Sequence, residues 1–297
     1  MIILEGLSAF PITPSDATGQ VDVAALRKLV ARLCAAKVNS IGLLGSTGTY
    51  AYLSRSERRR ALEAALDEVG GQVPILVGVG ALRTDEALRL AQDARAAGAA
   101  AGLLAPVSYT PLTEDEVFEH FATIARESGL PLCIYDNPST THFRFSPTLI
   151  GRLSRLPGII AVKSPAPEPQ AVAAHLAELR SVVPDGFSLG YSVDWHSVEA
   201  LIAGGDVWYS VIAGLFPQIS MTLVQAVRDG GIEEARRLNA RLDPLWSVFK
   251  EFSSLRVIYA SADLLGICRA EPPRPILPLS DAARQRVADV PQTLELS

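Results

Sequence analysis

Residues 157–167 read PGIIAVKSPAP, and this short stretch carries the strongest indication of the fold. Its apolar residues, 159–162, occupy consecutive positions, run directly into Lys163 and are followed by a proline-rich loop. Consecutive apolar positions are typical of a strand that is buried on both faces, as in a parallel sheet covered by helices. The stretch therefore predicts such a strand, with a lysine at its carboxyl end.

Seven further runs have the same character and bring the number of predicted strands to eight. They read LSAFPIT from Leu7, SIGLLG from Ser40, PILVGVG from Pro74, AAGLLAPV from Ala100, PLCIYDNP from Pro131, FSLGYS from Phe187 and VWYSVIAG from Val207. Amphipathic segments separate the runs. Several of these segments begin at a residue suited to cap a helix, namely Asp22, Ser54, Thr84 and Thr113. Eight strand–helix units favour a (β/α)₈ TIM barrel over an open doubly wound sheet, which remains the alternative fold.

The C-terminal part of the chain has a different pattern. No strand pattern follows Gly214, and residues 220–267 predict three consecutive helices with a break at Gly230–Gly231. We therefore expect two parts, a (β/α)₈ barrel over residues 1–225 and a C-terminal helical region over residues 226–297 that packs on the barrel.

Composition bears on partners and location. The chain has 297 residues, of which 48% are hydrophobic, and a formal net charge of −5. Acidic and basic residues are mixed along it, so neither a nucleic acid nor a membrane is expected as a partner. No apolar run approaches the roughly 18 residues of a membrane span, and the N-terminus has no basic signal region. We expect a soluble cytoplasmic protein.

Neither a metal nor a cofactor is expected. The three cysteines, Cys34, Cys133 and Cys268, are widely separated and odd in number, which argues against a disulfide framework or a zinc site and favours a reducing compartment. The four histidines lack metal-ligand spacing. The segment GVGALR from Gly78 lacks the third glycine of a dinucleotide fingerprint.

In a βα barrel, catalytic groups lie at the carboxyl ends of the strands and in the loops that follow. This rule selects Thr13, Ser46, Thr47, Thr49, Ser108, Tyr109, Tyr135, Asp136, Asn137, Lys163, Ser164, Tyr191 and Ser192. Lys163 is the one cation among them. Desolvation at a barrel mouth disfavours an ammonium and favours the neutral amine, which is a nucleophile for carbonyl carbons, so Lys163 is a candidate for Schiff-base chemistry. The alternative is a strand-end lysine that extends to solvent.

Other candidates lie on neighbouring loops. The phenol of Tyr135 suits a proton relay, although a tyrosine at the top of a barrel is also an ordinary packing residue. The turn GSTGTY, residues 45–50, offers hydroxyls and backbone N–H groups to a carboxylate, although a plain turn would look the same. His142 is a candidate for lining the site, whereas His120 and His175 are expected on helix surfaces.

Several motifs together resemble the dihydrodipicolinate synthase and N-acetylneuraminate lyase family of class I Schiff-base aldolases and lyases, which fold as (β/α)₈ barrels. The motifs are AFPITP, GSTG, IYDNP, GIIAVKS, GGDVWYSV and the tail LLGICRAEPPRPILPLS, and they cover nearly the whole chain.

The resemblance implies roles for individual residues. Lys163 is then the Schiff-base lysine, Tyr135 the proton-relaying phenol and Ser46–Thr47 the pair that binds the carboxylate of a keto acid, with Thr47 also in the relay. Tyr209, at a position that is usually isoleucine, is expected to contact substrate, as are Thr140 and His142. The substrates would be a pyruvate-like 2-oxo acid and an aldehyde, and the protein a homo-oligomer, a dimer or a tetramer.

Departures from the family pattern fall on the side that would bind the aldehyde. Thr49 replaces a glutamate, and Thr140 stands where dihydrodipicolinate synthases carry an arginine for the carboxylate of their aldehyde substrate. A threonine cannot supply that charge. Ser108 falls on the position of a tyrosine that reaches into a neighbouring subunit, and Tyr109 is the candidate to replace it, as a relay group or as a neighbour-subunit contact.

These departures lead us to expect a Schiff-base lyase or aldolase, acting by aldol cleavage, condensation or dehydration, that is not a standard dihydrodipicolinate synthase. Two alternatives stay open. One is an authentic 4-hydroxy-tetrahydrodipicolinate synthase of lysine biosynthesis that binds its aldehyde differently. The other is a non-catalytic regulatory barrel, because a fold alone does not fix a function.

Overall fold

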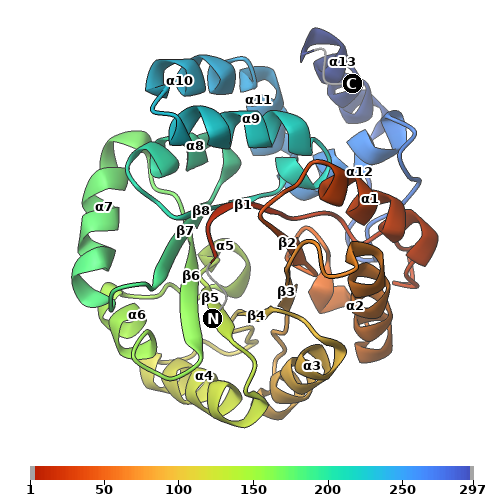
Figure 1. Ribbon diagram of the computed structural model, residues 1–297. Helices are drawn as coiled ribbons and strands as arrows, with labels where there is room; N and C mark the ends of the chain where they lie inside the picture. Colours follow the sequence, from red (N-terminus) through yellow and green to blue (C-terminus); the bar gives the residue numbers. More distant parts are fainter. Residues whose placement is uncertain (1–3, 295–297) are drawn as a thin grey trace.

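The computed structural model describes residues 4–294 and contains a closed barrel of eight parallel strands in chain order (Figure 1). The strands are β1 (Gly6–Ala9), β2 (Ser40–Leu43), β3 (Ile75–Gly78), β4 (Ala101–Leu104), β5 (Leu132–Tyr135), β6 (Ile159–Pro165), β7 (Ser188–Ser192) and β8 (Val207–Ser210). Pairing of β1 with β8 closes the sheet. Every strand overlaps one of the eight apolar runs, so the predicted TIM barrel is confirmed and the open sheet is wrong.

Helices surround the strands and cover the outer face of the barrel (Figure 1). They are α1 (Val23–Ala35), α2 (Arg55–Val69), α3 (Thr84–Ala97), α4 (Glu114–Ser128), α6 (Pro147–Leu153), α7 (Pro169–Val182), α8 (Asp194–Ile202) and α9 (Pro217–Arg228). Three shorter helices lie in loops, namely η1 (Tyr50–Tyr52), α5 (Pro138–Thr141) and η2 (Ile212–Gly214). None of the helices formed by residues 4–294 has both the length and the apolar character of a membrane span.

The predicted helix caps are confirmed at three positions out of four. The side chains of Asp22, Ser54 and Thr113 accept backbone N–H groups of α1, α2 and α4. Thr84 instead is the first residue of α3, and its hydroxyl lies 2.9 Å from Nδ1 of His120. The expectation that His120 lies on a helix surface is therefore wrong: it is 9% exposed, and burial lowers the pKa of its imidazole to about 4.

The C-terminal region contains α10 (Ile232–Ala240), α11 (Asp243–Phe252), α12 (Ser254–Leu264) and α13 (Asp281–Leu294). Residues 220–267 thus span parts of four helices rather than the three expected. The predicted break at Gly230–Gly231 separates α9 from α10, and a second break at Ser253, which has φ 73°, separates α11 from α12. Helix α9 continues to Arg228, so the proposed division after residue 225 falls inside it, and that division stays a prediction.

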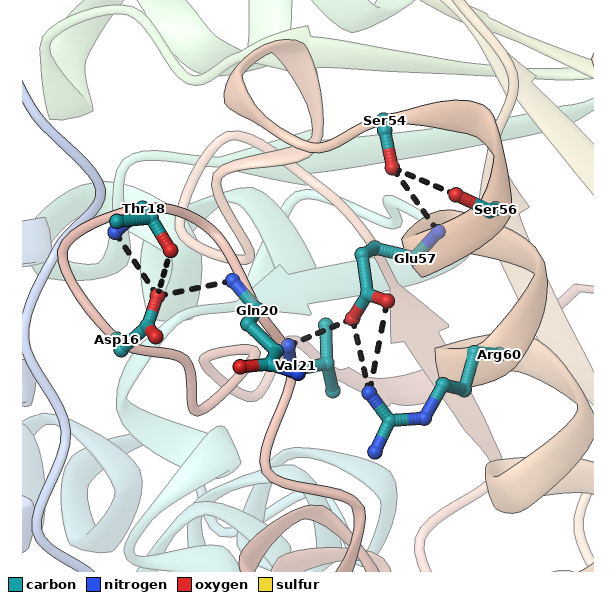
Figure 2. A network of polar contacts seen from close by, with 8 residues as sticks. All are labelled: Asp16, Thr18, Gln20, Val21, Ser54, Ser56, Glu57 and Arg60. Atoms are coloured by element: carbon teal, nitrogen blue, oxygen red, sulfur yellow. Dashed lines mark hydrogen bonds and ion pairs between the residues drawn. The ribbon is translucent and has the colours of Figure 1, made fainter.

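The loop between β1 and α1 is tied to two other parts of the chain. Figure 2 shows Asp16 accepting from Thr18 and Gln20, while Glu57 of α2 accepts the Val21 N–H at 2.7 Å. On its other side, the Tyr259 hydroxyl of α12 donates to the Thr13 carbonyl at 3.1 Å. The C-terminal region therefore braces the loop that follows the first strand.

The barrel interior is a separate core from the one between strands and helices. It contains Leu4, Phe10, Leu76, Ala101, Leu103, Ala105, Cys133, Tyr135, Ala161, Val207 and Tyr209. Because successive residues of a strand point to opposite faces, Lys163 faces the same side as Ala161, toward the interior.

Candidate active site

Lys163 lies inside the barrel, near the carboxyl end of β6, between Tyr135 of β5 and Gly190 of β7 in the sheet register. It is 3% exposed, so the alternative in which its side chain extends to solvent is wrong. Its Nζ lies over three aromatic rings, 3.7 Å from the centroid of Phe10, 4.4 Å from that of Tyr135 and 5.8 Å from that of Tyr209. Aromatic faces attract a cation at these distances, so they partly offset the cost of burying it.

The hydroxyl of Tyr135 belongs to a three-residue hydrogen-bonded group. It lies 3.0 Å from Ser46 Oγ, and the Asn137 side-chain amide donates to the Tyr135 oxygen at 3.0 Å and to Ser46 Oγ at 3.3 Å. The ring of Tyr135 thus lies against Nζ, while its hydroxyl is hydrogen-bonded on the side of Ser46 and Asn137. The sequence marked Asn137 as a strand-end position but gave it no role.

The turn that carries Ser46 and Thr47 is compact. The Thr49 N–H donates to the Ser46 carbonyl at 3.0 Å, and Thr49 itself has φ 54°. A Cβ at Gly48 would lie 3.0 Å from the Leu44 Cα, which explains the glycine there. Thr47 is buried, 6% exposed, within this turn.

The other predicted residues have different contacts. Tyr209 is fully buried, and its hydroxyl lies 3.5 Å from Cys133 Sγ rather than at Tyr135. Thr140 is exposed and donates its hydroxyl to the Asn137 carbonyl at 3.2 Å. His142 is exposed at the end of α5, and Tyr109 is 96% exposed. The structure thus brings Lys163 together with Tyr135 and places Ser46 next to it, while Thr140, His142 and Tyr109 lie on exposed loops.

Two buried acids flank the strand ends. Burial raises the pKa of Asp136 to about 6, although the Phe145 backbone N–H and Arg144 oppose the shift, and Asp136 Oδ1 has no hydrogen-bond partner within residues 4–294. Burial also raises the pKa of Asp194, which accepts the indole N–H of Trp208 at 2.9 Å. Asp194 fixes the loop after β8, and Asp136 joins the end of β5 to the loop that follows it.

A cavity of about 390 Å³ lies beside the turn and is lined by residues that include Tyr50, Arg58, Gly80 and Val107. Arg58 is buried there and donates to the Gly78 and Gly80 carbonyls, and burial lowers the pKa of its guanidinium to about 10. Lys163 does not line this cavity. The surroundings of the Lys163 amine are therefore set by the aromatic rings of the barrel interior and not by this cavity.

Among residues 4–294, no group of three His, Cys, Asp or Glu side chains is arranged to hold a metal ion. Sequence reasoning overlooked Phe10, whose ring is nearer to Nζ than any other. It follows the first strand in the segment AFPITP, where an apolar residue resembles any other core residue. Only its place beside a buried lysine distinguishes it.

Comparisons with known proteins agree with this geometry. The family model described as the dihydrodipicolinate synthetase family matches residues 3–293. The 4-hydroxy-tetrahydrodipicolinate synthase of Chlorobium limicola is 32% identical over 295 residues, covering 99% of this chain and 98% of its own length. That of Alcanivorax borkumensis is 31% identical over 279 residues, covering 94% and 93%.

Solved structures give the same result. The crystal structure of a dihydrodipicolinate synthase from Agrobacterium tumefaciens is 55% identical, with a TM-score of 0.95 and 98% of each chain covered. A dihydrodipicolinate synthase from Acinetobacter baumannii, solved in complex with pyruvate, is 25% identical, with a TM-score of 0.90 and 99% of each chain covered. The chain therefore belongs to the dihydrodipicolinate synthetase family and is an enzyme of the class I aldolase and lyase type.

Proposed function

We propose that this enzyme is a Schiff-base lyase in which Lys163 condenses with the ketone of pyruvate or a related 2-oxo acid. The observation that carries the proposal is the buried Lys163 amine, 3% exposed, set against the ring of Tyr135. The relative from Acinetobacter baumannii was solved with pyruvate bound, which supports a 2-oxo acid as the first substrate.

The reaction begins when the neutral amine of Lys163 attacks the carbonyl carbon to form a carbinolamine. Loss of the former carbonyl oxygen as water then forms the C=N bond, and the iminium withdraws electrons from the adjacent C–C or C–O bond. Tyr135, linked to Ser46 at 3.0 Å, supplies and recovers the proton on the departing oxygen, and Thr47 extends this relay. Ser46 and Thr47 also bind the keto-acid carboxylate through the turn.

The second substrate is an aldehyde other than aspartate semialdehyde. Thr140 has no charge for a second carboxylate, and its hydroxyl already donates to the Asn137 carbonyl. Thr140, His142 and Tyr209 are the residues we assign to the remainder of the substrate. The alternative is an authentic 4-hydroxy-tetrahydrodipicolinate synthase, the name that two of the relatives carry. The non-catalytic barrel, the third interpretation of the sequence, is set aside because the chain belongs to a family of enzymes.

Borohydride reduction tests the Schiff base directly. Incubation with pyruvate and then borohydride should leave a reduced adduct on the peptide that contains Lys163, detected by mass spectrometry. Lys250, which lies over the ring of Trp195 on the protein exterior, provides an internal control and should stay unmodified. If pyruvate and a panel of other 2-oxo acids all fail to modify Lys163, the lyase proposal is wrong.

A coupled assay with pyruvate and aspartate semialdehyde tests the substrate. Enzymes ordinarily turn over at roughly 10 per second. We expect turnover of aspartate semialdehyde far below that rate. The variant Thr140→Arg restores a guanidinium at this position and is expected to raise activity toward aspartate semialdehyde. Ordinary rates with the unmodified enzyme would instead establish the authentic synthase.

We further propose that the protein is a cytoplasmic homo-oligomer, a dimer or a tetramer, in which Tyr109 contacts the site of a neighbouring subunit. Its 96% exposure within one chain supports this role. A monomeric variant that keeps Tyr109 should lose activity, and full activity in that monomer would exclude the idea.

A further inference from the structure

The ring of Phe10 is the aromatic group nearest to the reactive amine. Its centroid lies 3.7 Å from Lys163 Nζ, compared with 4.4 Å for the ring of Tyr135. Phe10 is 1% exposed, so water does not screen the contact. Cation–π attraction operates within about 6 Å of a ring centroid and is strongest when the pair is desolvated.

Two glycines make room for the ring. A Cβ at Gly42 would lie 2.1 Å from Phe10 Cε2, and a Cβ at Gly45 would lie 2.7 Å from Phe10 Cδ1. Real Cβ atoms do not approach ring carbons so closely. Any larger residue at Gly42 or Gly45 would displace Phe10. Glycine in β2 and in the turn after it therefore leaves the space that the Phe10 ring occupies.

The other side of the ring is also fixed. Tyr209 packs on Phe10 with ring centroids 6.0 Å apart and an interplanar angle of 88°, a favourable edge-to-face arrangement. Tyr209 in turn occupies space left by Gly190, where a Cβ would lie 2.3 Å from Tyr209 Cε2. The backbone N–H of Phe10 donates to the Ser210 carbonyl at 2.8 Å. Phe10 is therefore held rigidly beneath the amine.

We propose that Phe10 is a further catalytic residue, whose ring stabilises the positive charge on Lys163 Nζ in the ammonium and in the iminium. This role rests on the proposed function. Overall, the ammonium and the ketone give the iminium and one water, so the N–C bond forms, the C–O bond breaks and the charge stays on nitrogen. The intervening amine and carbinolamine are neutral. The ring therefore favours the iminium over the carbinolamine. Conversion of the carbinolamine into the iminium is the step that makes the electron-withdrawing group.

A series of fluorinated phenylalanines at position 10 tests this proposal. Fluorine withdraws electron density from the ring face and changes its shape little, so a purely steric role would be unaffected. With one, two and three fluorines, and at an alkaline pH where the free amine of Lys163 is neutral, we expect the fraction of Lys163 trapped by borohydride at saturating pyruvate to fall stepwise, by about tenfold over the series, because only the iminium then carries the charge that the ring stabilises. A flat series in an enzyme that traps pyruvate would overturn the role of Phe10.

Phe121 provides the matched control. It is fully buried on α4, outside the barrel, in edge-to-face contact with Phe145 at 5.7 Å. The same fluorinated residues at position 121 should leave trapping and turnover unchanged. An equal fall at both positions would show that fluorination acts through stability, and the proposal would fail. Circular dichroism checks the folding of each variant, and the trapped fractions are compared only among the variants that fold.

Formaldehyde separates the failure of this proposal from the failure of the proposed function. It forms an iminium with any accessible amine, so reductive methylation of Lys163 reports on the ring without requiring a 2-oxo acid as substrate. If no 2-oxo acid is trapped but methylation falls along the fluorine series, the lyase proposal fails and the interaction with Phe10 stands. If pyruvate is trapped while both probes give flat series, Phe10 has no electronic role.

Discussion

Two parts of this site differ in how the fold holds them. The activating cluster, which comprises Lys163, Tyr135, Ser46 and Asn137, sits on strand ends and the first residues after them, and its amine is 3% exposed. The outer loops, residues 107–112 and 138–145, carry Thr140, His142 and Tyr109, which are exposed. A closed barrel fixes the first group through eight paired strands, whereas loops vary freely around the same scaffold. A constant activation chemistry can therefore serve different second substrates.

Replacing the nucleophile should have the largest effect on the activating cluster. For Lys163→Met, we expect no trapped adduct with any 2-oxo acid and a loss of kcat/KM of at least about 1,000-fold, because no other amine can form the iminium. Mass spectrometry after borohydride reduction and steady-state kinetics measure both effects. Lys250→Met is the matched control and should keep full activity. Residual adduct elsewhere in the barrel would show that the nucleophile had been misassigned.

Tyr135→Phe should separate the ring of this residue from its hydroxyl. The ring 4.4 Å from Nζ remains, so the trapped fraction should change little, while kcat should fall about 100-fold because the proton relay through Ser46 is lost. Trapping at saturating pyruvate and kcat are measured in parallel. A kcat within about threefold of the unmodified enzyme would remove the phenol from the mechanism.

Asp136 joins the two parts, and its replacement should stabilise the protein in a pH-dependent way. The folded-state pKa of about 6 lies above the ordinary value of 3.8, so the folded protein holds this proton more tightly, and stability from this group falls as pH rises from about 4 to 6. Asp136→Asn, which keeps the shape of the side chain but removes its charge, should raise the free energy of unfolding by about 2 kcal/mol at pH 7.5.

The same difference should shrink toward zero near pH 4, where the aspartate is protonated in both states. Urea denaturation of both proteins at pH 7.5 and pH 4.5 measures it. A gain of equal size at both pH values would mean that the carboxylate is not the cause. The measurement bears on the contrast between the activating cluster and the outer loops, because Asp136 connects the end of β5 with the loop that carries Arg144 and Phe145.

The sequence predicted the barrel, which the structure confirms, and proposed Lys163 as the nucleophile for the same physical reason. Strands buried on both faces leave consecutive apolar residues, and a lysine at the end of such a run is conspicuous. The place of Phe10 beside Lys163 escaped prediction, and Thr84 was wrongly predicted as a helix cap, because each side chain contacts a partner that is distant in the sequence, Lys163 for Phe10 and His120 for Thr84. The break between α11 and α12 at Ser253 lies within a continuous helical pattern of apolar residues. It is therefore visible in the backbone angles and not in the sequence.

The smallest effects are expected from the outer loops when pyruvate alone is present. Thr140→Ala and His142→Ala should change the rate of pyruvate trapping by less than about twofold, because Thr140 bonds only the Asn137 carbonyl and His142 is exposed. The same variants should alter KM for the aldehyde while leaving the trapped fraction intact. Steady-state kinetics at saturating pyruvate, with aldehydes of different charge and length, measure this difference. If either variant slows trapping tenfold, the two parts of the site are not independent, because an exposed loop would then control a lysine in the barrel interior.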